Sequence, residues 1–144
     1  MAAFLSFESQ AQKGADWLPY LDDCKKTVAI DPATKRVLRT GIEGRPPDIN
    51  LSQADFSVVF DEDEEPTAAG GHIRFGLKAI KGAGAKAIDS IIGERDTPDP
   101  EHPDDPSKRV SDKYTSLFDF TERVPPGTVN KATIEALVKA VAFV

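Results

Sequence analysis

The sequence predicts an α+β fold in one domain over residues 1–144: a mostly antiparallel sheet of four to five strands, with N-terminal, central and C-terminal helices. Three observations predict it. Several short runs alternate apolar and polar residues, which is the period of a half-buried strand. Three stretches repeat apolar residues every three or four positions, which is typical of an amphipathic helix. Clusters of proline and glycine separate these runs and indicate turns.

Residues 72–95 combine apolar periodicity, positive charge and small side chains, and the predicted fold is organised around them. Residues 72–79 alternate as a strand does, which leaves 82–85 as a glycine-rich turn and 86–94 as a short helix. One long helix also fits the apolar spacing, but the two glycines of the turn would each cost about 1 kcal/mol relative to alanine. We therefore favour strand, turn and helix.

The first third of the chain predicts a helix and a β-hairpin. Apolar residues spaced by three or four predict a helix over 3–17, which Pro19 ends. Residues 27–30 and 36–39 contain β-forming side chains and flank an Asp-Pro turn, so we expect them to pair as a hairpin. The prolines of 41–50 favour an extended loop after it.

The strongest predicted strand is 54–60, which carries aromatic and β-branched side chains on one face. An acidic run, 61–65, and a short Ala-Gly segment separate it from the possible strand 72–79. We expect these two strands to pair in antiparallel orientation.

Residues 96–112 are predicted to form an exposed arm or strap within the single domain. Their first part, 96–107, holds four prolines and five acidic residues but no large apolar group, and such a segment cannot bury enough surface to order itself. Beyond the arm, alternation with one aromatic face predicts a last strand over 114–121.

A C-terminal helix is predicted to close the chain. The Pro-Pro-Gly break at 125–127 precedes Thr128 and Asn130, either of which can cap a helix. The apolar residues of this helix recur at helical spacing, and we expect them to pack on one face of the sheet: Ile134, Leu137, Val141 and Val144.

Composition limits the classes of function. The net charge of −6 disfavours nucleic acid as a partner, because phosphate binding depends on clustered lysine and arginine. A single cysteine, Cys24, excludes an intrachain disulfide. We find neither the pattern of a signal peptide nor an apolar run long enough to span a membrane. We therefore expect an acidic, soluble protein that is synthesised in the cytoplasm and that can be part of an assembled particle.

The glycine-rich turn is the one candidate ligand site. It follows a possible strand and precedes a possible helix, the arrangement in which backbone N–H groups meet a phosphate at a helix N-terminus. The turn matches neither the Walker pattern, because no serine or threonine follows Lys86, nor the full dinucleotide-binding fingerprint, because Ala87 stands where its third glycine belongs. An ordinary turn is therefore the competing interpretation. The candidate ligand-binding residues are Lys81, Gly82, Gly84 and Lys86.

No cofactor and no specific metal site are expected. His102 lies among acidic residues, but ligands spaced by prolines on a flexible arm are not preorganised. The sequence also lacks the local motif of a nucleophilic serine, and catalytic residues stay unassigned.

Absent catalytic groupings, an extended arm and apolar terminal helices favour a non-enzymatic structural or interaction subunit of a larger assembly, for example a virion or tail-like component, with protein partners or self-association. Two alternatives are a phosphate-ligand enzyme that uses the turn 82–85 and a membrane-active protein that uses the basic amphipathic stretch 72–92. The candidate interface residues are Trp17, Tyr20, Ile134, Leu137, Val141 and Phe143.

Overall fold

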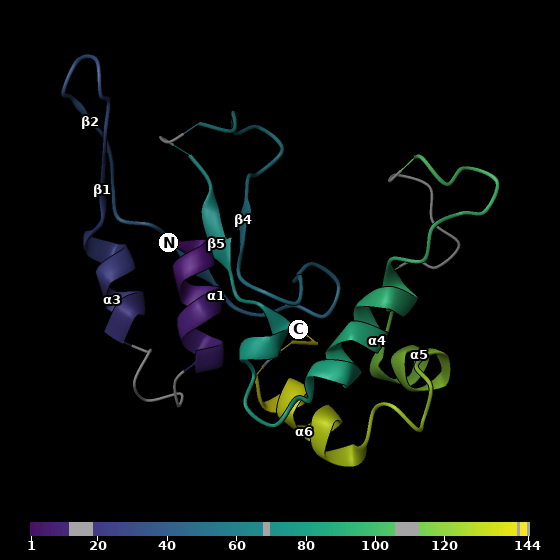
Figure 1. The fold of residues 1–144 in the computed structure, drawn as a ribbon. Helices are drawn as coiled ribbons and strands as arrows, with labels where there is room; N and C mark the ends of the chain where they lie inside the picture. Colours follow the sequence, from purple (N-terminus) through teal and green to yellow (C-terminus); the bar gives the residue numbers. More distant parts are fainter. Residues whose placement is uncertain (12–18, 68–69, 106–112, 141, 144) are drawn as a thin grey trace.

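The computed structural model describes residues 1–11, 19–67, 70–105, 113–140 and 142–143. Helices and short strands both occur, so the α+β prediction is confirmed in general (Figure 1). The prediction of one sheet with four to five strands is wrong, because the described strands form one sheet of two strands and one of three.

The helices form two groups along the chain. Figure 1 shows α4, α5 and α6 gathered together, while α1 and α3 lie on the side of the strands. The predicted central and C-terminal helices are thereby confirmed, and the N-terminal one is described as far as Ala11. The helical elements are α1 (Ala2–Ala11), α3 (Pro19–Lys26), the 3-10 helix η1 (Leu77–Ala79), α4 (Ala85–Arg95), α5 (Leu117–Arg123) and α6 (Lys131–Lys139).

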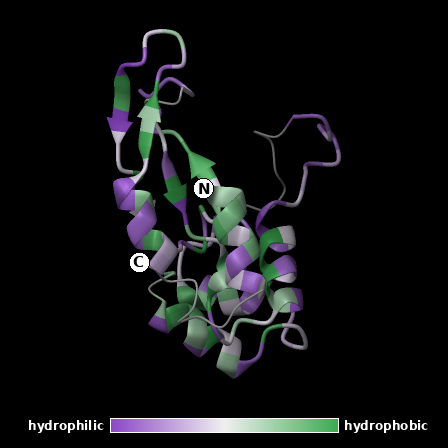
Figure 2. Ribbon diagram, turned by 60° about the vertical axis from the view of Figure 1, so that its left-hand side comes forward, coloured by the Kyte–Doolittle hydropathy of each residue, from purple (hydrophilic) through white to green (hydrophobic). Residues whose placement is uncertain are grey.

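The predicted β-hairpin is confirmed: β1 (Val28–Ile30) pairs antiparallel with β2 (Val37–Thr40). This hairpin extends away from the helices, and its colouring in Figure 2 shows apolar residues on both strands. Four of its apolar side chains are between 44% and 60% exposed: Val28, Ile30, Val37 and Leu38.

The second sheet has the strand order β3-β5-β4, with β3 (Gly44–Arg45), β4 (Ser57–Val59) and β5 (His72–Arg74). The antiparallel pairing of β4 with β5 was predicted and is confirmed. The parallel pairing of β3 with β5 was not predicted. It is short because Pro46 and Pro47 follow β3 directly, and proline has no N–H group to donate to a neighbouring strand.

The predicted strand 72–79 ends early, at Arg74. A Cβ atom on Gly76 would lie 2.4 Å from the carbonyl carbon of Asp55, so the backbone there packs directly against another segment. The N–H group of Leu77 donates to the carbonyl oxygen of Gln53 at 3.0 Å. These contacts turn the chain away from the sheet and into η1.

The predicted strand 114–121 is wrong, because α5 occupies most of it. Oγ of Ser116 accepts a hydrogen bond from the N–H of Asp119, and the Asp119 carboxylate accepts one from the N–H of Thr115. Serine followed three residues later by an acidic residue is a helix-start signal, and it decides the local structure.

The core consists of two clusters of buried side chains. The smaller one lies between α1, α3 and the three-stranded sheet and contains Leu5, Cys24, Phe56 and Ile73. The larger one joins the helices, where Leu137 of α6 packs in the same cluster as Ile88 and Phe120. The expectation that the C-terminal helix packs on a sheet face is therefore wrong. No helix of the described chain is long and apolar enough to cross a membrane.

Candidate nucleic-acid interface

Residues 80–84 form a tight hairpin between η1 and α4. The N–H group of Ala83 donates to the carbonyl oxygen of Ile80 at 3.2 Å, which closes the turn. Gly82 has a φ angle of +92°, in a region that side chains with a Cβ atom rarely adopt. The predicted glycine-rich turn and the helix after it are confirmed.

The hairpin lies close to α6. A Cβ atom on Gly82 would lie 3.5 Å from Cβ of Ala136, which is ordinary van der Waals contact. The turn therefore lies beside a helix about 50 residues further along the chain. The larger core cluster joins these elements, because it contains Leu77 of η1, Ile88 of α4 and Leu137 of α6.

Gly84 is the N-cap residue of α4 and is open to the outside. Its φ of −67° and ψ of 141° are extended values that any residue adopts, and as a glycine it forms no side-chain cap. Within the described parts of the chain, a Cβ atom on Gly84 would meet no atom within 4 Å. Internal packing and backbone conformation therefore leave this glycine unexplained, whereas close approach of a ligand to the backbone would account for it.

The N-terminus of α4 presents free donors and positive charge. The first N–H groups of an α-helix have no acceptor within the helix, and here they belong to Ala85, Lys86 and Ala87. The side chains of Lys81 and Lys86 are exposed and form no ion pair with any residue that the structure describes. Lys78, by contrast, pairs with Asp89 at 3.0 Å.

The N-terminus of α6 differs at the corresponding position. Its N-cap is Asn130, whose Oδ1 atom accepts hydrogen bonds from the N–H and the hydroxyl of Thr133 at 2.9 Å and 3.1 Å. The cap thus already occupies donors that a ligand would use. Of these two helix starts, only that of α4 lacks a side-chain cap.

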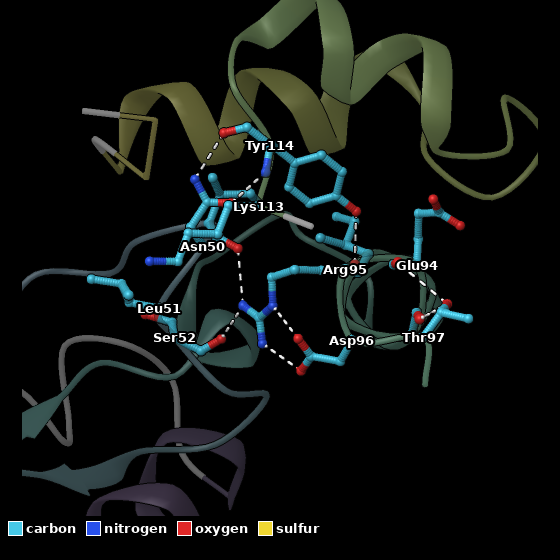
Figure 3. Close-up of polar contacts among 12 residues, drawn as sticks. Asn50, Leu51, Ser52, Glu94, Arg95, Asp96, Thr97, Lys113 and Tyr114 are labelled. Carbon is cyan, nitrogen blue, oxygen red and sulfur yellow. Dashed lines mark hydrogen bonds and ion pairs between the residues drawn. The ribbon is translucent and has the colours of Figure 1, made fainter. Parts of the chain in front are cut away.

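The C-terminal end of α4 is clamped by Arg95, whose side chain is 3% exposed (Figure 3). Its Nη1 atom donates to the carbonyl oxygens of Ile49 and Ser52 at 3.0 Å and 2.8 Å. Its Nε and Nη2 atoms donate to the two carboxylate oxygens of Asp96, each at 2.8 Å. The guanidinium therefore ties α4 to the loop 49–52.

Tyr114 adds a second clamp, visible above Arg95 in Figure 3. Its hydroxyl donates to the carbonyl oxygen of Ile91 at 2.8 Å, and its backbone exchanges two hydrogen bonds with the side chain of Asn50. Burial raises the pKa of Tyr114 to about 12, so the hydroxyl stays protonated and donates. Together the clamps fix the direction in which α4 presents its N-terminus.

The sequence offered no signal for these clamps. Arg95 donates to backbone carbonyl groups more than 40 residues away in the sequence. Every residue has such a carbonyl group, so the residue types at the acceptor positions give no indication of the contact. Only the tertiary structure brings them together.

The predicted interface residues are spread over both halves of the structure. Tyr20 stacks edge-on against Phe4 with ring centroids 4.9 Å apart, and Phe143 does so against Phe120 at 5.1 Å. Leu137 is fully buried and Ile134 is half-buried. Trp17 and Val141 lie outside the described residues. A role of these six residues in an interface stays a prediction.

Residues 41–144 match the family model of the helix-hairpin-helix motif, which covers more than half of the sequence. The chain belongs to the helix-hairpin-helix family. The matched region contains the hairpin 80–84 with η1 and α4, and also α5, α6 and the turn between them. Two helical hairpins of the described chain thus lie within the matched residues 41–144.

Relatives of this helix-hairpin-helix chain include two bacterial proteins named DNA polymerase III subunit alpha. The protein of Thermus aquaticus is 38% identical over 103 residues, which cover 72% of this chain and 7% of the relative. The protein of Saccharopolyspora erythraea is 31% identical over 141 residues, which cover 98% of this chain and 10% of the relative. The chain therefore spans a tenth or less of the length of these relatives.

These findings correct the functional expectations. A virion or tail-like structural subunit is wrong, because the family and the relatives indicate a DNA-related role. The expectation of no nucleic-acid partner is wrong for the same reason: a net charge describes the whole chain, whereas Lys81 and Lys86 stand at one helix end. The same findings support neither of the two alternative functions, the membrane-active protein and the phosphate-ligand enzyme. The stretch 72–92, which the membrane-active alternative used, is divided between β5, η1 and α4.

Proposed function

We propose that this chain binds DNA through the sugar-phosphate backbone, at the hairpin 80–84 and the N-terminus of α4, as a DNA-contacting segment of a replication protein. One observation carries the proposal: Gly84 opens α4 without a side-chain cap of its own, and a Cβ atom on it would meet no described atom within 4 Å, on the exposed side of a hairpin in a helix-hairpin-helix protein. The names of the relatives support DNA as the ligand.

The chemistry of the site suits a phosphate. Amides at a helix N-terminus point outward together, and the positive end of the helix dipole favours an anion there. The absence of a Cβ atom on Gly84 lets a phosphate oxygen approach the backbone closely. Lys81 and Lys86 add charge on either side of the glycines. Contacts of this kind position a protein on DNA but do not read its sequence.

The two acidic segments of the chain do not adjoin the hairpin, and the exposed Asp89 of α4 is paired with Lys78. The acidic run 61–65 lies in the loop between β4 and β5, and the acids of 96–105 follow the far end of α4 (Figure 1). Charges more than about 10 Å apart are largely screened at moderate salt. The charge near the hairpin therefore decides the attraction.

The test is fluorescence anisotropy of labelled DNA, duplex and single-stranded, over a series of salt concentrations. We expect binding without sequence preference that weakens with salt. The double variant Lys81→Gln/Lys86→Gln should lower the salt slope by about 2, one unit for each lost phosphate contact. The control Lys25→Gln/Lys26→Gln removes the same charge from the exposed end of α3.

Two outcomes would overturn the proposal. One is no binding of either DNA at low salt. The other is an equal loss in both double variants, which would mean that charge anywhere on the chain, and not the hairpin, governs binding.

A further inference from the structure

Three potential metal ligands converge at the edge of the three-stranded sheet. One ligand atom each from Asp61, Glu64 and His72 lies within 4.8 Å of the other two. Asp61 and Glu64 are exposed residues of the loop that leaves β4, and His72 is the first residue of β5. The strand pairing brings the loop back to the sheet at this point, because Val59 lies opposite His72.

A second observation is independent of the acidic residues. His72 is 2% exposed, and its Nε2 atom is buried without a hydrogen-bond partner among the residues that the structure describes. A buried polar atom normally has a partner, since leaving it unpaired costs about 1–3 kcal/mol. An imidazole nitrogen is also the most common protein ligand of transition metals.

From this convergence we propose a binding site for a divalent transition-metal ion, Zn²⁺ in the first place, with Asp61, Glu64 and His72 as its ligands. One imidazole and two carboxylates form a mixed nitrogen and oxygen set, which suits Zn²⁺ better than the all-oxygen preference of Mg²⁺ or Ca²⁺. Three protein ligands leave a fourth tetrahedral position for water. Ligands about 2 Å from one ion are at most about 4 Å apart, so the exposed carboxylates need to shift by roughly 1 Å.

Two arginines hold the loop between β4 and β5, which carries Asp61 and Glu64, one at each end. Arg45 donates from Nη1 and Nη2 to the two carboxylate oxygens of Asp61, both at 2.9 Å. Each carboxylate oxygen has a second lone pair, so Asp61 can bind Arg45 and an ion together. At the other end, Arg39 donates to the carbonyl oxygens of Gly70 and Gly71.

This site departs from the expectation that the chain has no specific metal site, and it lies outside the proposed DNA-binding hairpin. Its ligands come from the acidic run and from His72, which the sequence places eight or more residues apart. The group around His102 is not part of this proposal, because the Nδ1 atom of His102 contacts Asp99 at 3.1 Å on an exposed turn.

The experiment is calorimetric titration of the 144-residue chain with Zn²⁺. We expect one equivalent to bind. Glu64→Gln should weaken binding at least about tenfold, the loss that even an outer partner of a metal ligand produces. The matched control is Glu62→Gln, which removes the same charge from an exposed neighbour in the same run. Glu64 is exposed, so Glu64→Gln should leave the fold intact, whereas a substitution of the buried His72 could unfold the chain.

Nuclear magnetic resonance gives a second readout, because the chain has two histidines. Zn²⁺ should shift the ring signals of His72 and leave those of His102 unchanged. The proposal is overturned if no Zn²⁺ binds, if His102 responds in place of His72, or if Glu62→Gln weakens binding as much as Glu64→Gln does.

Discussion

Gly82 of the hairpin lies beside Ala136 of α6, since a Cβ atom on Gly82 would be 3.5 Å from Cβ of Ala136, an ordinary van der Waals distance. The two residues come from the two helical hairpins of the chain. Their proximity places the turn 80–84 beside α6. The open side of the same turn, at Gly84, is then free for DNA in our proposal.

The first prediction concerns the conformation of Gly82. Gly82→Ala should lower the free energy of unfolding by about 1–2 kcal/mol, because alanine is strained at a φ of +92°. Urea unfolding followed by circular dichroism measures it. Gly93→Ala is the contrasting variant, since Gly93 lies within α4 with free space around it and alanine favours a helix by about 1 kcal/mol. Equal destabilisation in both variants would contradict the explanation.

The second prediction separates stability from DNA binding at Gly84. Gly84→Ser places a hydroxyl at the N-cap, which can accept a bond from the first turn of α4 and stabilise the chain by a few tenths of a kcal/mol. The same side chain occupies the space proposed for a phosphate, so DNA affinity should fall. Gly127→Ser, in the turn before α6, is the control and should retain affinity. Unchanged DNA binding by Gly84→Ser would remove Gly84 from the site.

The third prediction concerns the clamp at Arg95. Arg95→Met should lower the free energy of unfolding by about 3 kcal/mol, because the carbonyl groups of Ile49 and Ser52 lose a buried charged donor. The exposed Arg36 provides the control variant Arg36→Met, for which we expect little change. A small effect at Arg95 would show that the packing of α4 alone holds the loop 49–52.

The fourth prediction concerns pH and Tyr114. The phenol of an unperturbed tyrosine has a pKa of 10.0, whereas burial raises the pKa of Tyr114 in the folded chain to about 12. Between these values the unfolded chain has lost a proton that the folded chain keeps, so the free energy of unfolding falls as pH rises. Comparing the wild type with Tyr114→Phe by urea unfolding isolates this contribution. The difference between them should be constant below pH 10 and shrink toward pH 12; a constant difference throughout would contradict the cause.

Local patterns predicted those elements whose signals are local. The Asp-Pro turn of 31–35 indicated the β1–β2 hairpin, and two glycines with the apolar residues after them indicated the turn before α4. The same reasoning failed for 114–121, where alternating aromatic residues suggested a strand. Phe118 is 72% exposed and Phe120 is fully buried, so the pair do not share a face. The Ser116 cap was the decisive signal.

The remaining features depend on contacts between distant residues. Gly76 ends β5 because it lies against Asp55, and neither residue shows this in the sequence. The residues of the proposed DNA-binding site, Lys81, Gly82, Gly84 and Lys86, were singled out from the sequence as candidates for a phosphate-bearing ligand, and this role stays a prediction. The net charge of the whole chain, −6, does not show that two lysines lie close to the start of α4.

The most direct test of DNA binding at the hairpin is a titration of the ¹⁵N-labelled chain with a short DNA duplex, followed by the backbone amide signals. We predict the largest shifts at Gly84, Ala85 and Lys86, with little change at the capped start of α6 around Thr133. Shifts confined to other surfaces, such as the β1–β2 hairpin, would contradict the proposed interface.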